Sequence, residues 1–228
     1  MKFVHGRSMR AAPFRALLKL FAIVMLTFPV RADTAATPIT LVAFGDSLTA
    51  GYLLPPSAAF PAQLQVALQA RGHKVLVVNA GVSGDTTANG VERLDWTLQT
   101  GADAVILELG ANDALRGVDP KQTRANLDKM LSVITATGAD VLVAGMKAPS
   151  NWGDDYVAAF DGIFPELAKK YNVALYPFFL EGVALNRSLI LSDGLHPTTE
   201  GVAEIVKRIL PDAEALVRRA AARRTAVK

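Results

Sequence analysis

The stretch Phe44-Gly45-Asp46-Ser47-Leu48-Thr49-Ala50-Gly51-Tyr52 follows directly on an apolar run, residues 39–44, and it decides the fold of the chain. A continuous apolar run that ends in turn residues is typical of a buried strand in a parallel sheet. Ser47 is therefore expected just past the carboxyl end of a strand, which is the edge where open α/β sheets bind ligands. A serine in this place is more commonly a helix cap than a nucleophile, so its role depends on what other loops supply.

The rest of the chain alternates between apolar runs and helical patterns. Four further strands are expected at residues 74–78, 104–109, 141–145 and 173–176. Helices are expected near residues 60–68 and 91–98, from 120 to about 137 with Asp119 as the N-cap, from 156 to 170, and from Pro197 into the basic end. Alternation of strands and helices predicts a parallel sheet with right-handed crossovers and helices on both faces.

The amino-terminal segment has the pattern of a secretory signal. Basic residues between Lys2 and Lys19 precede the apolar run 20–28, and Val30-Arg31-Ala32 offers small residues at a cleavage site. We expect cleavage after Ala32, with a second site near Ala36. This leaves residues 33–228 as one domain in the periplasm or outside the cell. The alternative is an uncleaved anchor, but the run is short for a membrane span.

Composition excludes several classes of function. Residues 1–32 carry six basic residues and no acid, so their removal leaves 18 Lys and Arg against 21 Asp and Glu, a net charge of −3. Binding to nucleic acid or to an anionic membrane is therefore not expected. The basic tail from about residue 218 is interpreted as a frayed, solvated helix end, with surface attachment as the alternative. The absence of cysteine excludes disulfides, Cys nucleophiles and Cys-ligated metals.

Two histidines remain after residue 32, and only one lies at the expected catalytic edge. His73 precedes a strand at its amino end, which is the wrong edge of the sheet. His196 follows Asp193 by three residues across a glycine, so one tight turn could carry both side chains. In that arrangement the carboxylate fixes the imidazole tautomer, and the other ring nitrogen takes the Ser47 proton. By itself the segment also fits a turn that leads into a helix with Pro197 at its first position.

Two other loops at the same edge could donate hydrogen bonds to a substrate oxygen. Gly84 follows the second strand and has no side chain to keep a carbonyl away from its backbone N–H. Asn112 follows the third strand and offers a side-chain N–H. Asp46 and Asp113 adjoin these candidates, and we interpret both as structural residues that hold loop backbone rather than as catalytic acids.

Four motifs in this order resemble those of the GDSL, or SGNH, hydrolases. They are Gly-Asp-Ser-Leu at 45–48, Gly84 within Ser-Gly-Asp-Thr, Gly-Ala-Asn-Asp at 110–113, and Asp193-x-x-His196. The resemblance covers roughly residues 38–215. It is closest to the bacterial periplasmic members with combined thioesterase, lysophospholipase and arylesterase activity.

The resemblance implies a flavodoxin-like α/β/α sandwich with strand order 2-1-3-4-5. It assigns Ser47 as the nucleophile, His196 as the base and Asp193 as its orienting acid. It also implies an oxyanion hole formed by Ser47 and Gly84 backbone N–H groups and the Asn112 side chain. No metal or cofactor is implied. The loop 114–118 resembles an acyl-binding loop, which makes Leu115, Arg116 and Gly117 candidates for substrate binding.

These features predict a broad-specificity serine esterase that acts on small acyl or aryl esters and thioesters, with a monomer as the default state. A glycan O-acetylesterase would use the same residues. We favour the first because apolar residues are expected near the cleft, namely Leu53, Leu54, Leu115 and residues 178–180. A non-catalytic binding module would need a broken triad, and every member is present.

Overall fold

The computed structural model describes residues 1–3, 37–99 and 101–226. Apart from residues 1–3, the predicted export segment lies outside the described residues. The described residues from 37 onward belong to one compact unit. None of the helices within the described residues is long and apolar enough to cross a membrane.

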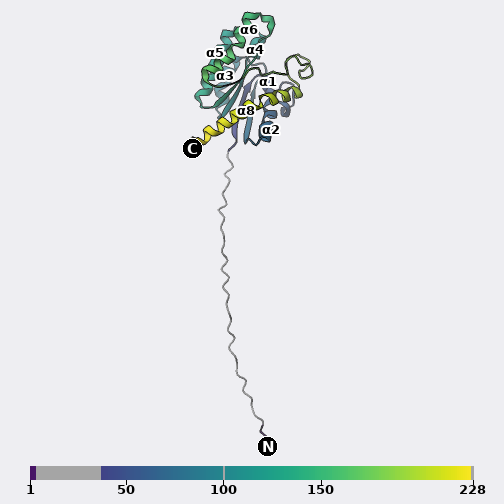
Figure 1. The fold of residues 1–228 in the computed structure, drawn as a ribbon, viewed down its shortest axis with the longest axis vertical. Helices are drawn as coiled ribbons and strands as arrows, with labels where there is room; N and C mark the ends of the chain where they lie inside the picture. Colours follow the sequence, from purple (N-terminus) through teal and green to yellow (C-terminus); the bar gives the residue numbers. More distant parts are fainter. Residues whose placement is uncertain (4–36, 100, 227–228) are drawn as a thin grey trace. The chain divides into compact units, whose positions relative to one another are not determined.

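Five parallel strands form a single sheet in the order β2-β1-β3-β4-β5, the order that the family resemblance implied (Figure 1). The strands are β1 Ile39–Gly45, β2 Val75–Gly81, β3 Ala104–Glu108, β4 Asp140–Ala144 and β5 Ala174–Tyr176. The central strands β1, β3 and β4 are almost entirely buried, whereas the edge strand β2 alternates between buried and exposed residues. The apolar runs of the three central strands therefore correspond to strands covered on both faces, whereas β2 and β5 are only partly covered.

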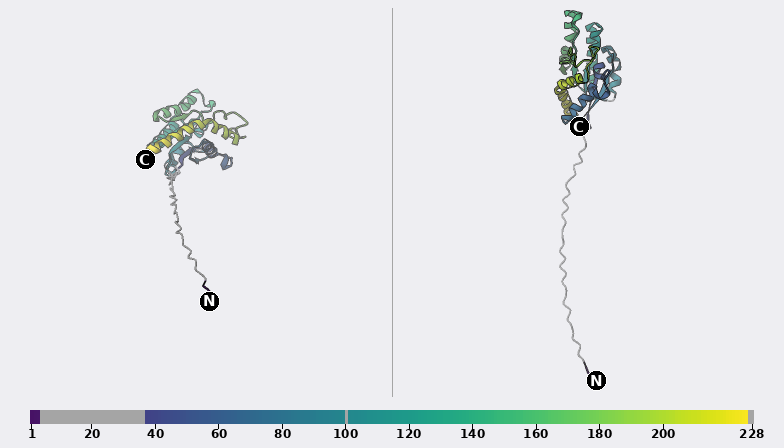
Figure 2. Two further views of the ribbon diagram at one scale, coloured as in Figure 1. Left: turned by 60° about the horizontal axis from the view of Figure 1, so that its bottom comes forward. Right: turned by 90° about the vertical axis from the view of Figure 1, so that its right-hand side faces the viewer.

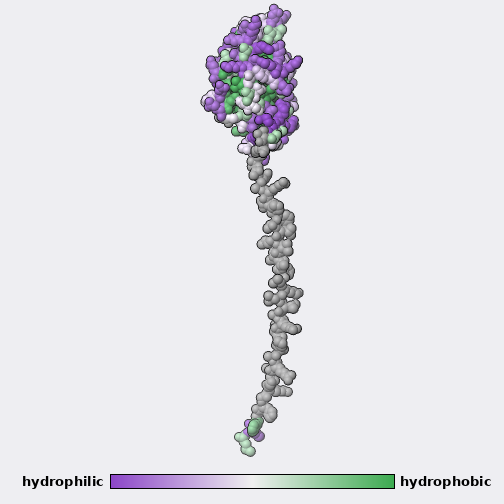
Figure 3. Space-filling model, turned by 90° about the vertical axis from the view of Figure 1, so that its left-hand side faces the viewer, coloured by the Kyte–Doolittle hydropathy of each residue, from purple (hydrophilic) through white to green (hydrophobic). Residues whose placement is uncertain are grey.

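Two layers of helices cover the sheet. In one layer α2, Phe60–Ala70, packs against α8, Thr199–Ala226, the yellow helix that runs across the domain in the left view of Figure 2. In the other, α5, Pro120–Ala136, packs between α3, Thr87–Leu98, and α7, Ile163–Tyr171. On the face drawn in Figure 3, hydrophilic residues surround a smaller hydrophobic area.

The shorter elements lie in the connections between strands and helices. They are the helices α1 Ser47–Ala50, α4 Ala111–Leu115 and α6 Asp154–Asp161, and the 3₁₀ turns η1 Pro56–Ala58 and η2 Ser150–Trp152. The expected N-cap of α5 is present, because the Asp119 side chain accepts a hydrogen bond from the Lys121 backbone N–H at 2.9 Å. Ser47 and Asn112 thus each begin or lie in a very short helix that directly follows a strand.

The single helix expected over residues 156–170 is instead two helices, α6 and α7, which meet at Gly162. Pro165 explains the break. A proline ring clashes with the carbonyl four residues earlier, here that of Asp161, and the proline donates no N–H to it. The chain must therefore end one helix before Pro165 and start another with the proline in its first turn.

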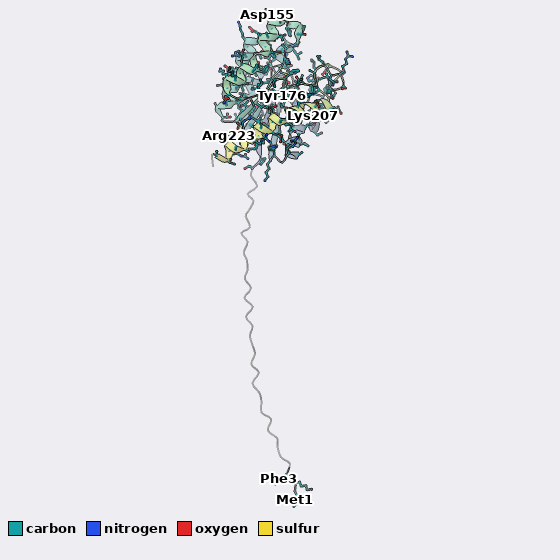
Figure 4. The ribbon with its side chains drawn as sticks, viewed as in Figure 1. Met1, Phe3, Asp155, Tyr176, Lys207 and Arg223 are labelled. Atoms are coloured by element: carbon teal, nitrogen blue, oxygen red, sulfur yellow. The ribbon has the colours of Figure 1, made fainter. Side chains whose placement is uncertain are left out.

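The carboxyl end of α8 is not the frayed, solvated end that the sequence predicted. The helix continues to Ala226, and the Arg223 guanidinium donates to Asp140 Oδ2 at 3.2 Å and to the Asp103 carbonyl at 2.7 Å. Arg224 also pairs with Asp103, at 3.1 Å. Figure 4 places Arg223 at the opposite end of the domain from Asp155, which begins α6 together with Asp154. Arg223 and Arg224 therefore bind the carboxyl end of α8 to residues at the amino ends of β3 and β4.

Candidate active site

The turn from β1 into α1 fixes the position of Ser47. Gly45 has no space for a side chain, since an added Cβ would lie 2.2 Å from Thr49 Oγ1 and 2.6 Å from the Glu108 carbonyl oxygen. Asp46 then caps α1 by accepting from the Leu48 N–H at 3.0 Å. Gly51 ends the helix in the left-handed conformation, with φ of 83°. Ser47 is only 8% exposed, so its hydroxyl is held at the floor of a cleft.

The loop between β5 and α8 brings His196 and Asp193 to Ser47, although His196 is 149 residues away in the sequence. The His196 Nε2 atom lies 2.9 Å from Ser47 Oγ, and Nδ1 lies 2.7 Å from Asp193 Oδ2. The other Asp193 oxygen accepts from the Leu195 and His196 backbone N–H groups, at 2.9 and 3.0 Å. The three side chains therefore form the continuous hydrogen-bonded relay that a serine hydrolase needs.

The electrostatics of this loop keep Asp193 ionised. Desolvation by itself would raise the pKa of the Asp193 carboxyl. The backbone N–H groups of Leu195 and His196, together with the His196 ring, outweigh desolvation and lower the pKa to about 2. An ionised Asp193 accepts the Nδ1 proton, so Nε2 is the nitrogen left to accept a proton from Ser47.

Tyr52 contacts the ring of His196, although Tyr52 is not among the site residues predicted from the sequence. Its ring centroid lies 4.5 Å from that of His196, with an angle of 40° between the planes. A backbone hydrogen bond also fixes the position of His196, because its carbonyl accepts from the Leu191 N–H at 2.7 Å. Tyr52 lies close in sequence to the Gly-Asp-Ser-Leu motif, which could have suggested a position near the site. Nothing in the sequence indicates its contact with His196.

Gly84 and Asn112 lie at the same edge, but their hydrogen bonds differ. Gly84 has φ of 88°, a conformation that suits glycine, and open space at the position of a Cβ. The Asn112 Nδ2 group already donates to Asp46 Oδ2 at 3.2 Å and to the Asp85 carbonyl at 3.0 Å. Because an amide has two N–H groups, Asn112 must share or redirect one of them to serve a substrate oxygen.

The expected acyl-binding residues are divided between the cleft and its rim. Leu115 lines the cleft. The Arg116 guanidinium instead donates to the Gly84 carbonyl at 3.0 Å, which ties α4 to the Gly84 loop. Gly117, at φ of 66°, lies under Trp152, whose ring would be 2.6 Å from an added Cβ.

The cleft itself has a volume of about 170 Å³ and is mainly apolar. Its lining comprises Ser47, Leu48, Ala111, Asn112, Ala114, Leu115, Met146, Lys147, Pro149, Phe178, Leu180, Leu195 and His196. Of the apolar residues expected near the cleft, Phe179 is instead fully buried against Phe60, and Leu53 is 73% exposed outside the lining. Lys147 also lines the cleft, and its ammonium lies 5.2 Å from the centre of the Phe178 ring.

A pair of buried carboxyl groups lies next to the start of α1. Glu108 accepts from Thr49 Oγ1 at 2.7 Å and from the Asp46 backbone N–H at 3.3 Å. Burial raises the pKa of Asp46 to about 6. Burial and the nearby Asp46 charge raise the pKa of Glu108 well above its usual range. At neutral pH Asp46 is thus ionised and accepts from Asn112, while burial and the Asp46 charge both disfavour the ionised form of Glu108. The sequence signal for this pair is a glutamate at the end of an apolar strand. Glu108 was nevertheless not among the predicted site residues.

Replacing Asp46 with asparagine should flatten the pH dependence of stability between about pH 4 and pH 6. The pKa of Asp46 is about 6 in the folded chain against an ordinary value of 3.8, so the folded chain keeps a proton that the unfolded chain releases. Wild-type stability should therefore fall as the pH rises through this window, by up to roughly 3 kcal/mol from this group. Urea unfolding of both proteins across pH 4–7 measures the slope, and parallel curves would contradict this account.

The two remaining candidates have structural partners. Asp113 accepts from the Thr87 N–H at 2.8 Å and from the Thr87 and Thr123 hydroxyls, so it joins the starts of α3 and α5 to α4. His73 pairs with Glu214 at 3.1 Å, just before β2 begins. Within the part of the chain that the structure describes, no cluster of three or more His, Asp or Glu side chains could hold a metal ion.

The four motif loops and this geometry agree with a match to a known family. The sequence profile of the GDSL-like lipase/acylhydrolase family matches residues 43–203. The chain belongs to this family. This GDSL hydrolase is 42% identical to an arylesterase of Vibrio mimicus over 198 residues, which are 85% of this chain and 98% of that protein.

Two further comparisons agree. Thioesterase 1/protease 1/lysophospholipase L1 of Escherichia coli strain K12 is 42% identical over 188 residues, covering 82% of this chain and 86% of that protein. The crystal structure of AlinE4, an SGNH-hydrolase family esterase, superimposes with a TM-score of 0.67 at 44% identity, covering 77% of this chain and 95% of that one. The predicted family, fold and esterase class of this GDSL hydrolase are confirmed.

Proposed function

We propose that this esterase hydrolyses carboxylic esters and thioesters with apolar acyl or aryl groups, through an acyl-enzyme intermediate on Ser47. The observation that carries the proposal is the relay from Asp193 through His196 to Ser47, at 2.7 and 2.9 Å, which opens onto an apolar cleft. Related proteins named arylesterase and thioesterase/lysophospholipase support this range of substrates.

The reaction starts with proton transfer from Ser47 Oγ to His196 Nε2 as Oγ attacks the carbonyl carbon. Negative charge develops on the carbonyl oxygen, where the N–H groups of Ser47, Gly84 and Asn112 would stabilise it. His196 then gives its proton to the departing alcohol or thiol. Water attacks the acyl-enzyme by the same steps, which releases the acid and restores Ser47.

The apolar lining favours a hydrocarbon group over an acetylated sugar. A sugar ring needs several hydrogen-bonding partners, whereas most of the side chains around the cleft offer none. A glycan O-acetylesterase therefore remains the second candidate, with acetyl transfer from a sugar to water as its reaction. We also propose export to the periplasm or the medium, which the basic and apolar residues 1–32 support.

A panel of p-nitrophenyl esters and acetylated sugars tests this proposal. Octanoate should be hydrolysed with a higher kcat/KM than acetate, and Leu115→Ala should lower the octanoate-to-acetate ratio by about tenfold, because an alanine buries less of the longer chain. Leu76→Ala is the matched control, because Leu76 is 48% exposed against 45% for Leu115 but lies on β2 outside the cleft. A marked preference for acetylated sugar, unchanged by Leu115→Ala, would favour the second candidate.

A further inference from the structure

The Arg93 side chain, on α3, joins the ends of two strands to the Gly84 loop. Its guanidinium donates to the Gly45 carbonyl at 2.8 Å, to the Ala80 carbonyl at 2.9 Å and to Asp85 Oδ2 at 2.6 Å. The guanidinium also lies over the Phe44 ring, 4.0 Å from its centre. The side chain is only 19% exposed, and all three of its nitrogen atoms have acceptors.

Two of the three acceptors, Gly45 and Asp85, lie next to groups of the expected oxyanion hole, and the third, Ala80, lies at the end of β2, which leads into the Gly84 loop. Gly45 lies two residues before Ser47, and its carbonyl also accepts from the Val82 N–H at 3.0 Å. Asp85 directly follows Gly84, and its backbone carbonyl accepts from Asn112 Nδ2 at 3.0 Å. Arg93 is therefore connected to Gly84 and to Asn112 through Asp85 alone, and to Ser47 through Gly45 and Asp46, so it reaches all three members of the expected oxyanion hole.

We propose that Arg93 is a positioning residue, which holds the Gly84 N–H and the Asn112 side chain at a fixed distance from Ser47. The proposal rests on the proposed function, and it goes beyond the motif residues that first indicated that function. Arg93 is absent from the lining of the cleft, so it acts through its neighbours and not on the substrate.

The chemistry of arginine suits this role. A planar fork of donors is rigid, and the Phe44 ring fixes its plane, so three acceptors keep one mutual geometry. Oxyanion stabilisation depends on donors that are already in place when charge develops. A lysine would keep a positive charge beside Asp85, but a single ammonium on a flexible chain has no fork that matches the same three acceptors.

Arg223 provides a matched control for a purely structural arginine. It also makes a carboxylate and a carbonyl hydrogen bond, to Asp140 and Asp103, but at the amino edge of the sheet, away from Ser47. Loss of either arginine should reduce stability. Only loss of Arg93 should disturb the donors around the reacting carbonyl.

The test compares Arg93→Met, Arg93→Lys and Arg223→Met in the full chain, with p-nitrophenyl butyrate as the substrate. Arg93→Met should lower kcat by about 100-fold, the effect of a misplacement on the order of 1 Å, with KM changed by less than about threefold. Arg93→Lys should fold and lose most of the same activity. Arg223→Met should lower the melting temperature but keep wild-type kcat at temperatures where it is folded.

A double-mutant cycle with Asn112→Ala separates positioning from a general loss of structure. If Arg93 acts through Asn112, adding Arg93→Met to Asn112→Ala should lower kcat by clearly less than it does in the wild type. Equal losses in both backgrounds, or kcat retained in both Arg93→Met and Arg93→Lys, would overturn the proposal. Labelling of wild-type Ser47 by a phosphonate tests the proposed function separately, so the two can fail independently.

Discussion

Ser47→Ala should lower kcat/KM for p-nitrophenyl butyrate by about 10⁴- to 10⁶-fold, because the variant has no atom that can form the acyl-enzyme. The residual rate would come from a water molecule placed among the same hydrogen-bond donors. The fold should survive, since the only side-chain partner of Ser47 Oγ among the described residues is the His196 ring.

The control for this variant is Ser132→Ala, on the exposed side of α5, which should keep wild-type kinetics. The melting temperature of Ser47→Ala should stay close to that of the wild type. More than about 1% of wild-type activity in Ser47→Ala protein that is free of wild-type enzyme would contradict the assigned nucleophile, because triad losses are far larger than this.

Asp193→Asn should reduce kcat by about 10⁴-fold while leaving the loop folded. The asparagine oxygen can still accept from the Leu195 and His196 backbone N–H groups, which Asp193 Oδ1 does now. Its amide nitrogen would then face His196 Nδ1 and donate to it. That arrangement puts the imidazole proton on Nε2, where it faces Ser47 Oγ, and the ring can no longer take the serine proton.

Steady-state kinetics of Asp193→Asn measure this effect, with Asp119→Asn as the control. Asp119 caps α5 and is not connected to the relay, and asparagine caps a helix about as well as aspartate, so Asp119→Asn should keep both its stability and its kcat close to those of the wild type. A loss of less than about tenfold for Asp193→Asn would show that the carboxylate does not set the tautomer of His196.

The positions of the motif loops could be predicted from the sequence because they depend on local signals. The apolar run before Gly45 and the runs before Gly84 and Asn112 identify buried parallel strands, and parallel strands end at one edge of the sheet. This pattern alone places Ser47, Gly84 and Asn112 together. The spacing of His196 from Asp193 and the unsuitable position of His73 only suggested His196, and it was the family resemblance that assigned it to the site.

The partners of side chains far apart in the sequence were not predictable in this way. Arg223 and Arg224 looked solvated because nothing local indicated that α8 ends beside Asp103 and Asp140. The hydrogen bonds of Asn112 with Asp46 and Asp85, and those of Arg93 with Gly45 and Ala80, also depend on tertiary packing.

Two other features do have a local signal in the sequence, although neither was predicted. Pro165 sits where a continuous helix over residues 156–170 would force its ring against the Asp161 carbonyl, so the break at Gly162 was readable. Glu108 ends an otherwise apolar strand, and a charged residue in such a strand indicates a buried polar contact. Its contact with Thr49 and Asp46 places this carboxyl next to the nucleophile turn.

The central claim is that Ser47 becomes covalently acylated, and mass spectrometry after reaction with an ethyl p-nitrophenyl phosphonate tests it most directly. The account predicts one O-ethyl phosphonyl group per chain, which is the reagent without its p-nitrophenolate, on the peptide that contains Ser47, with p-nitrophenol released in equal amount and esterase activity lost in proportion. The adduct should form much more slowly in His196→Ala, since the base that takes the serine proton is gone. A stoichiometric adduct on another residue, or full loss of activity with Ser47 unmodified, would contradict the account.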